Sequence, residues 1–133
     1  MTPAAPERVR LVRVRELLAG APTSGKKILV DRLWPRGVAR ERLPLDAWLP
    51  QVAPSPALRR WFGHDPARFP EFARRYRAEL AANAAAKQLR ETLRDGPITL
   101  LYDARDSRHN HAVVLAQWLL EGLQAEESGA CPD

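Results

Sequence analysis

The sequence has a single cysteine, Cys131, close to its end. One cysteine cannot form a disulfide within the chain or supply a cysteine-based metal site, so both are excluded. No apolar run approaches the roughly 18–20 residues that are needed to span a membrane. Residues 1–7 are rich in proline and alanine and lack the apolar segment of a secretory signal. These absences predict a cytoplasmic protein.

Lysine is also scarce. Three lysines accompany 18 arginines, and the net charge is +5 with an isoelectric point of about 10.1. A basic charge of this size permits an anionic small molecule or nucleic acid as a partner. Abundant arginine together with abundant alanine is, however, what a GC-rich coding sequence produces. The positions of individual arginines are therefore stronger evidence than their number.

Several well-defined motifs are missing. The sequence has no Walker motif, no G-x-G-x-x-G and no G-x-S-x-G nucleophile elbow. His109 and His111 are two residues apart, which places them on different faces of a helix, and no H-x-x-x-H spacing occurs. We therefore predict no metal site, and the sequence does not identify a cofactor.

Two apolar stretches predict buried strands. Residues 27–33 contain a continuous apolar centre, and Ile98–Tyr102 is almost wholly apolar, as expected for strands that are covered on both faces. The alternating residues 9–14 predict a shorter strand. Residues 45–52 predict either an edge strand, because Pro50 cannot donate a ladder hydrogen bond, or a short helix at 46–49.

Helices are predicted between these strands from their start and stop signals and their apolar periodicity. The predicted helices are residues 56–62 after the N-cap Ser55, residues 66–80, residues 84–94 and residues 108–123 after the N-cap Ser107, with a helical turn at 38–43 and a loop at 16–26. Strands separated by helices pair in parallel. We predict one small α/β domain over residues 8–123, with disordered ends at 1–7 and 124–133. Its mostly parallel sheet has about three to five strands, with helices packed on its faces.

Both strong strands end in clusters of polar residues. Asp31, Arg32, Trp34 and Arg36 follow the first strand in a rigid turn that contains Pro35 and Gly37, and residues 103–111 follow the second. The carboxyl ends of parallel strands meet at one edge of the sheet, where ligands of open α/β sheets bind. The two clusters are therefore predicted to form one site.

The first cluster suggests an anion site. Arg32 and Arg36, together with Arg59, can hold a phosphate or carboxylate through paired guanidinium hydrogen bonds. Asp31 is a candidate base, or it orients an arginine; the alternative is a structural ion pair with Arg32, Arg36 or Arg59. Trp34 either stacks on a base or sugar of the ligand or packs against the protein.

The second cluster adds Asn110 and His111 near the start of the last predicted helix. A histidine at that position tends to stay neutral, which suits a base or a hydrogen-bond donor, and the backbone N–H groups there favour an anion. The alternative is a core histidine that a backbone carbonyl satisfies. Asp103 either contacts the ligand or holds the loop, and His64 is a weaker candidate. We predict catalytic roles for Asp31 and His111, and ligand contacts for Arg32, Trp34, Arg36, Arg59, Asp103 and Asn110.

Several specific strings occur in order along residues 9–122. They are LVDRLWPRG at residues 29–37, Trp61-Phe62-Gly63-His64, and Leu100-Leu101-Tyr102 followed by Asn110-His111-Ala112. In these strings the sequence resembles the YeaO-like group of the bacterial family called domain of unknown function 488. The resemblance implies a small, soluble, intracellular α/β protein, and it implies no reaction.

These observations favour a protein that binds, or acts on, a small anionic or phosphorylated ligand at the carboxyl edge of the sheet. The alternative is a nucleic-acid-binding accessory protein, suggested by the basic charge and by arginines of the predicted helices, namely Arg59, Arg60, Arg74, Arg75 and Arg77. A third reading is a stable domain whose polar clusters only hold its loops together. No membrane partner is expected, and the sequence does not indicate an oligomeric state.

Overall fold

The computed structural model describes residues 8–127. Within this range the chain forms a sheet of four parallel strands, which are β1 (Val9–Arg13), β2 (Lys26–Leu29), β3 (Ala47–Trp48) and β4 (Ile98–Tyr102). Their order in the sheet is β1-β4-β2-β3, so β4 lies between β1 and β2. The predicted α/β class and the parallel pairing are confirmed.

The centre of the sheet is its most apolar part. Every residue of β4 is buried, and β4 pairs with both β1 and β2 along its length. Side chains of successive strand residues point to opposite faces. Ile28 and Leu100 therefore contribute to the large core on one face, and Leu29 and Leu101 to a smaller core on the other.

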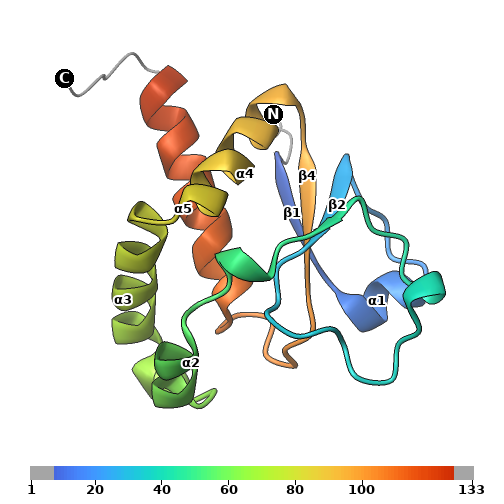
Figure 1. Cartoon of the computed structure of the whole chain (residues 1–133), viewed down its shortest axis with the longest axis horizontal. Helices are drawn as coiled ribbons and strands as arrows, with labels where there is room; N and C mark the ends of the chain where they lie inside the picture. The colour runs from blue at the N-terminus through green and yellow to red at the C-terminus, as the bar shows by residue number, and fades with distance from the viewer. Residues whose placement is uncertain (1–7, 128–133) are drawn as a thin grey trace.

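Helices cover both faces of the sheet. The helices α2 (Pro56–Phe62), α3 (Phe69–Ala81), α4 (Ala84–Asp95) and α5 (His111–Glu127) lie on one side, and the short α1 (Val14–Leu18) lies on the other (Figure 1). Helix α5 packs against α3, α4 and the sheet. No helix of the described residues is long and apolar enough to cross a membrane.

Helix α2 starts after its predicted cap, and α4 starts after a cap that was not predicted. The Ser55 hydroxyl accepts a hydrogen bond from the Leu58 backbone N–H, and Gly63 ends α2 in the left-handed conformation. Asn83 caps α4 in the same way, by accepting from the Ala86 N–H. The predicted helix at 66–80 is divided into a 3₁₀ turn, Pro66–Arg68, and α3.

Three predicted elements have wrong boundaries. Residues 14–18 form helix α1, although 16–26 was predicted as a loop, because the Glu16 carboxylate accepts from the Arg13 N–H and starts a helical turn. Strand β2 ends at Leu29, not at residue 33. Helix α5 starts at His111 after the cap Asn110, not after Ser107, and continues to Glu127, past the predicted end of this helix at 123.

Residues 45–52 contain the predicted edge strand in short form, and the alternative of a short helix at 46–49 is wrong. Ala47–Trp48 is the edge strand β3, and Pro50 starts a 3₁₀ turn immediately after it. A proline just outside an edge strand removes no ladder hydrogen bond. The disorder predicted for residues 1–7 and for 128–133 lies outside the described residues.

Candidate functional site

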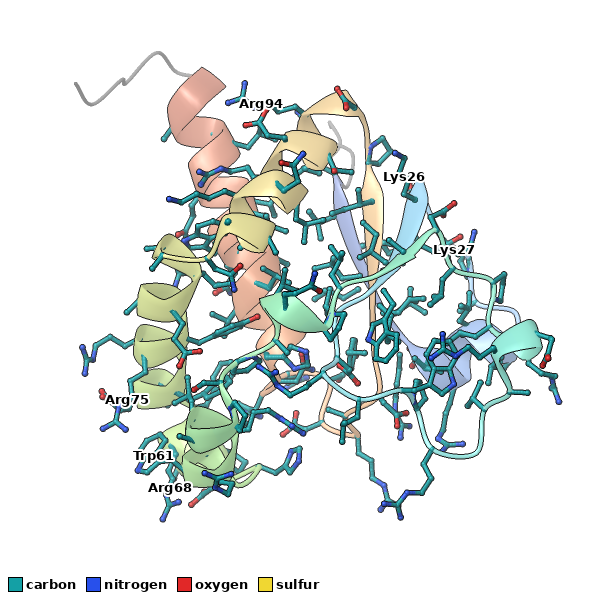
Figure 2. The ribbon with its side chains drawn as sticks, in the orientation of Figure 1. Lys26, Lys27, Trp61, Arg68, Arg75 and Arg94 are labelled. Atoms are coloured by element: carbon teal, nitrogen blue, oxygen red, sulfur yellow. The ribbon has the colours of Figure 1, made fainter. Side chains whose placement is uncertain are left out.

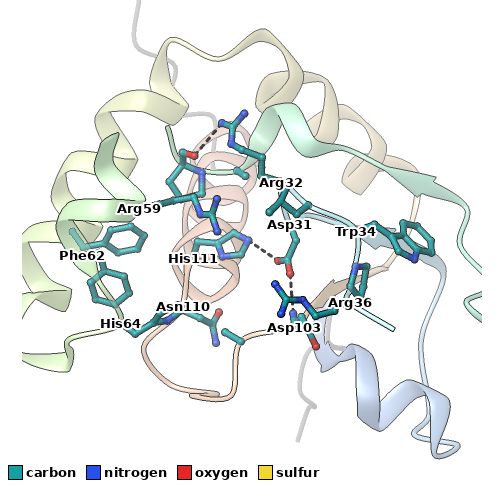
Figure 3. Close-up of a pocket in the computed structure, with 16 residues that line it drawn as sticks. Asp31, Arg32, Trp34, Arg36, Arg59, Phe62, His64, Asp103, Asn110 and His111 are labelled. Carbon is teal, nitrogen blue, oxygen red and sulfur yellow. Dashed lines mark hydrogen bonds and ion pairs between the residues drawn. The ribbon is translucent and has the colours of Figure 1, made fainter. Parts of the chain in front are cut away.

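A pocket of about 350 Å³ opens at the carboxyl ends of β2 and β4 (Figure 3). Its lining joins the two polar clusters that follow these strands and adds residues from α2 and α3. The lining residues are Asp31, Arg32, Leu33, Trp34, Pro35, Arg36, Ala53, Pro54, Arg59, Phe62, His64, Phe72, Asp103, Ala104, Asn110 and His111. The two clusters were predicted to converge because their strands are parallel, and all eight candidate residues line this one pocket.

Asp31 ties the two strand ends together. Its Oδ2 accepts a hydrogen bond of 3.0 Å from the Asp103 backbone N–H, and its own carbonyl accepts one of 2.8 Å from the Trp48 indole. Its Oδ1 is buried and receives no hydrogen bond, although it lies 3.1 Å from Nε2 of His111. Asp31 therefore contacts a histidine and a backbone amide in place of the arginine pairing that the sequence left open.

His111 is the first residue of α5, and only 16% of its side chain is exposed. Its Nε2 lies 3.0 Å from the Val30 carbonyl oxygen and 3.1 Å from Asp31 Oδ1. Both oxygens accept hydrogen bonds and cannot donate them, so Nε2 carries a proton that is directed at the Val30 carbonyl. Nε2 is therefore a donor in this arrangement and has no lone pair with which to accept a proton.

The three candidate arginines differ in how far they are engaged. Arg32 donates to the Pro54 carbonyl through Nη2 at 3.0 Å, and its buried Nε has no hydrogen-bond partner. Arg36 and Arg59 are exposed, and neither side chain forms a hydrogen bond, ion pair or ring contact with any other residue that the structure describes. Two guanidiniums on the pocket lining are therefore available to a ligand.

Asn110 is buried and holds the start of α5. Its Oδ1 accepts from the Val113 N–H at 3.1 Å, and its Nδ2 donates to the Asp106 carbonyl at 2.7 Å. Asp106 organises the preceding loop by accepting from the backbone N–H groups of Arg108 and His109 and from the His109 ring, and these bonds hold the pKa of its carboxyl below the ordinary value. Because both polar ends of Asn110 are engaged, it contributes to the pocket mainly by holding His111 in place.

Trp34 is held in contacts within the protein. Its indole N–H donates to the Val38 carbonyl at 2.6 Å, and its ring meets Trp48 edge-on with centroids 5.5 Å apart. The Arg40 guanidinium lies 4.6 Å from the centroid of Trp34 and 5.2 Å from that of Trp48. These contacts match the packing alternative, and Trp34 stiffens the loop that carries Arg32 and Arg36.

Asp103 links the pocket to β1 and α1. Its carbonyl accepts from the Arg13 guanidinium at 3.4 Å, and its Oδ1 is buried without a hydrogen-bond partner, with Arg15 Nε 3.9 Å away. The sequence left open whether this residue holds the loop or contacts a ligand. The structure shows the loop contacts.

Sequence reasoning missed the apolar part of the pocket. Phe62, Phe72, Ala53 and Pro54 line it, together with the exposed Leu33. The aromatic residues were predicted only as core faces of helices, and nothing in their spacing indicates which of them borders a cavity. These residues line the pocket because of where the fold places them, which their residue types do not indicate.

The predicted basic helix surface is partly neutralised. Glu71 accepts from Arg74 at 2.6 Å and from Arg75 at 2.7 Å, and these two arginines lower the pKa of Glu71 to about 2. Arg77 pairs with Glu121 of α5 at 2.6 Å. Among the described residues no group of three or more His, Cys, Asp or Glu side chains is placed to hold a metal ion.

Fold and pocket together define a class of protein: a small α/β domain whose four-stranded parallel sheet carries an arginine-lined pocket at its carboxyl edge. The family model described as the inactive DUF488-N3 subclade matches residues 8–133, and the chain belongs to this family. This confirms the resemblance to the YeaO-like proteins of that family.

The chain is also similar to curated proteins of two bacterial groups. An uncharacterised protein of Mycobacterium tuberculosis is 42% identical over 112 residues, which cover 84% of this chain and 93% of the relative. The uncharacterised Escherichia coli protein YeaO is 43% identical over 98 residues, which cover 73% of this chain and 85% of YeaO. No solved structure matches the chain.

Proposed function

We propose that this protein binds a small anionic ligand, such as a phosphorylated metabolite, in the pocket at the carboxyl ends of β2 and β4, and that it does not transform the ligand. The observation that carries the proposal is the pair Arg36 and Arg59. Both line the pocket, and neither has a partner among the described residues. Guanidiniums match the geometry of phosphate and carboxylate oxygens, so an anion is the natural partner of each of them.

The charge balance of the pocket supports an anion. Three arginines line it against two carboxylates, Asp31 and Asp103. The Asp31 carboxylate is already bonded to a backbone N–H and lies beside His111, and one oxygen of each carboxylate is buried. The exposed groups Arg36 and Arg59 are therefore the ones that an incoming ligand meets first.

The size of the pocket suits a small molecule. Ligand pockets have volumes of about 300–1,000 Å³ and combine an apolar lining with a few placed polar groups. This pocket, at about 350 Å³, lies near the lower limit and has such a mixed lining. A sugar phosphate or a mononucleotide is closer to this size than a polymer.

Two observations support binding without a chemical reaction, namely the hydrogen bonding of His111 and the description of the family. The Nε2 proton of His111 is directed at the Val30 carbonyl, which leaves this nitrogen unable to act as a base. The family is described as an inactive subclade. The catalytic roles predicted for Asp31 and His111 stay predictions, and the proposal needs these two residues only to hold the strand ends in position.

The nucleic-acid alternative has weaker support. Trp61, Arg68 and Arg75 gather at one end of α2 and α3 (Figure 2), with the Arg75 guanidinium 4.3 Å from the Trp61 ring centroid. However, Arg75 and Arg74 are paired with Glu71, which lowers the local charge available to phosphates. Binding that weakens steeply with salt would revive this alternative, and a flat salt response would remove it.

The proposal is tested by a thermal-shift screen of the full chain against phosphorylated and carboxylated metabolites. A ligand that binds the folded state raises the unfolding midpoint. The stabilisation should be lost in Arg36→Ala. It should persist in Arg42→Ala, because Arg42 is also exposed and without a partner among the described residues but does not line the pocket. Absence of any stabilising compound, or equal responses of the two variants, would contradict the proposal.

A further inference from the structure

One end of the pocket is an aromatic wall. Phe62 stacks on Phe72 with ring centroids 4.3 Å apart and planes inclined by 18°, and Phe72 stacks in turn on Tyr76 at 5.8 Å. Phe62 and Phe72 line the pocket but are otherwise buried in the core. The wall is therefore rigid before a ligand arrives, and an apolar group that contacts it does not have to order it.

His64 stands beside this wall in an unusual backbone conformation. Its φ of 58° makes it the one non-glycine residue with positive φ in the described part of the chain, and it follows Gly63, which is also left-handed at 54°. Histidine tolerates this region better than most residues, but glycine adopts it without strain. The two consecutive left-handed residues end α2 and bring the His64 ring to the pocket, 6.2 Å from the centroid of Phe62.

A backbone hydrogen bond of 3.0 Å from the Asp65 N–H to the Phe62 carbonyl closes the turn at His64, and this bond requires no particular side chain at that position. Its ring forms no hydrogen bond or ion pair with the other residues that the structure describes, and the residue is exposed. Strained residues of this kind gather at ligand sites, where the strain is retained because the side chain is needed in that position. The position of His64 on the pocket lining points to contact with a ligand.

The aromatic groups of the pocket are concentrated at one end. Phe62 and His64 lie at the α2 end, to which α2 also contributes Arg59, and Arg36 lies with Asp103 at the opposite end (Figure 3). Leu33, which is 67% exposed and is a large apolar residue, also lines the pocket. Burial of such a side chain against an apolar ligand surface is favourable. The lining therefore fits a ligand that is anionic at one end and flat and apolar at the other.

We propose that the ligand carries an aromatic or heteroaromatic ring, that the ring lies against Phe62 and His64, and that the anionic group reaches Arg36. This inference rests on the proposed function and narrows it to one chemical class, the ring-bearing anions. Nucleoside monophosphates and aromatic carboxylic acids share this chemistry. His64 would be the residue that selects for the ring, through stacking of its imidazole on the ligand.

The test compares the affinities of the full chain for methyl phosphate and phenyl phosphate in NMR titrations at one salt concentration. Phenyl phosphate should bind at least about tenfold more tightly, within the range measured when a base stacks on an aromatic side chain. A parallel comparison of the affinities for adenosine 5′-monophosphate and benzoate distinguishes nucleoside monophosphates from aromatic carboxylic acids as the ligand class. Equal affinities for methyl and phenyl phosphate would overturn the inference.

Two variants separate a role in binding from a role in folding. His64→Gly should raise the unfolding midpoint, because glycine is unstrained at this φ, and should remove most of the preference for phenyl phosphate. His64→Asn tolerates the left-handed region without offering a ring, so it should lose the same preference with little gain in stability. Retention of the ring preference in both variants would show that His64 only ends the helix, and would overturn its assignment.

The outcomes also distinguish this inference from the proposed function. If methyl phosphate binds in an Arg36-dependent manner and the ring adds nothing, the inference fails and the anion site stands. If none of these phosphates or carboxylates binds, both fail. If phenyl phosphate binds more tightly and the preference depends on His64, both are supported.

Discussion

At the scale of single residues, two glycines show that a positive φ and a lack of room for a Cβ are separate reasons for glycine at a position. Gly25 has a φ of 67°, and a Cβ added there would lie 1.8 Å from the Pro97 carbonyl oxygen. Gly37 has a similar φ of 79°, but a Cβ added there would meet nothing within 4 Å. Gly25 lets the segments that lead into β2 and β4 approach closely, whereas Gly37 only completes a turn.

The two glycines therefore predict different costs for alanine. Gly37→Ala should lose about 1–2 kcal/mol of unfolding free energy from left-handed strain alone. Gly25→Ala should lose about 2 kcal/mol more, because it adds a clash with backbone that cannot rotate away. Urea denaturation of both variants measures the difference. Equal losses would show that the contact at Pro97 relaxes without cost.

Single residues also show how much of the site could be predicted from the sequence. Asp31, Arg36 and His111 were predicted to share one sheet edge, because each follows an apolar strand in a parallel sheet, and they do line one pocket. Their hydrogen bonds were not predictable. The bond from Asp103 N–H to the Asp31 carboxylate spans 72 residues, and the contact of His111 with the Val30 carbonyl spans 81, so no local pattern encodes either.

At the scale of elements, the start of α5 decides where His111 lies. Asp106, Ser107 and Asn110 are all good capping residues within five positions, so the sequence could not select among them. In the structure Asp106 holds the loop, and Asn110 caps the helix. Strand β4 raised no such difficulty, since its run Ile98–Tyr102 is continuously buried and is bounded by Pro97 and Asp103.

This assignment predicts a contrast between two alanine variants. Asn110→Ala removes the N-cap and leaves the Asp106 carbonyl without its donor, so it should lose about 1–2 kcal/mol of unfolding free energy. Ser107→Ala should change stability by less than about 0.5 kcal/mol, because Ser107 is exposed and caps nothing. Chemical denaturation compares them, and a larger loss in Ser107→Ala would restore the helix start that the sequence predicted.

At the scale of the whole molecule, one buried phenol connects α3 to the segment before α2. The Tyr76 hydroxyl donates to the Val52 carbonyl at 2.5 Å, and Tyr76 packs against the ring of His111. Burial, with smaller contributions from the charges of Glu79 and Asp31, raises the pKa of Tyr76 well above its ordinary value. The neutral phenol is thus the form that the folded state favours.

The raised pKa of Tyr76 predicts a loss of stability in alkali. Its contribution is complete below the ordinary pKa of 10.0 and is lost as the pH rises from there toward the folded-state value, because the unfolded chain ionises first. At neutral pH, Tyr76→Phe should be about 1 kcal/mol less stable than the wild type, since it loses the hydrogen bond. Urea denaturation at pH 8 and at about pH 11 should show this gap shrinking, by up to about 1.4 kcal/mol per pH unit. If the stability difference between wild type and Tyr76→Phe does not change with pH, ionisation of Tyr76 does not cause the loss of stability in alkali.

The fold class was predictable because the apolar strands and the helix patterns between them are visible in the local sequence and do not depend on contacts between distant residues. Two apolar strands with helices between them require a parallel sheet that is covered on both faces. The strand order β1-β4-β2-β3 was not predictable, because the periodicity of an apolar strand does not specify its neighbours. Apolar periodicity likewise does not show that Phe62 and Phe72, which fit the core-facing pattern of their helices, also line the pocket.

The central claim is that Arg36 and Arg59 make this pocket an anion site. The most direct measurement is a titration of the ¹⁵N-labelled full chain with inorganic phosphate at constant ionic strength, followed by NMR, for the wild type, Arg59→Ala and Arg60→Ala. Arg60 is the matched control, because it is the neighbouring exposed arginine of α2, lacks a partner among the described residues and lies outside the pocket. We expect saturable shifts at residues 31–36, 59–64 and 103–111 that are lost in Arg59→Ala and retained in Arg60→Ala. Shifts scattered over exposed arginines, or equal responses of the two variants, would contradict the claim.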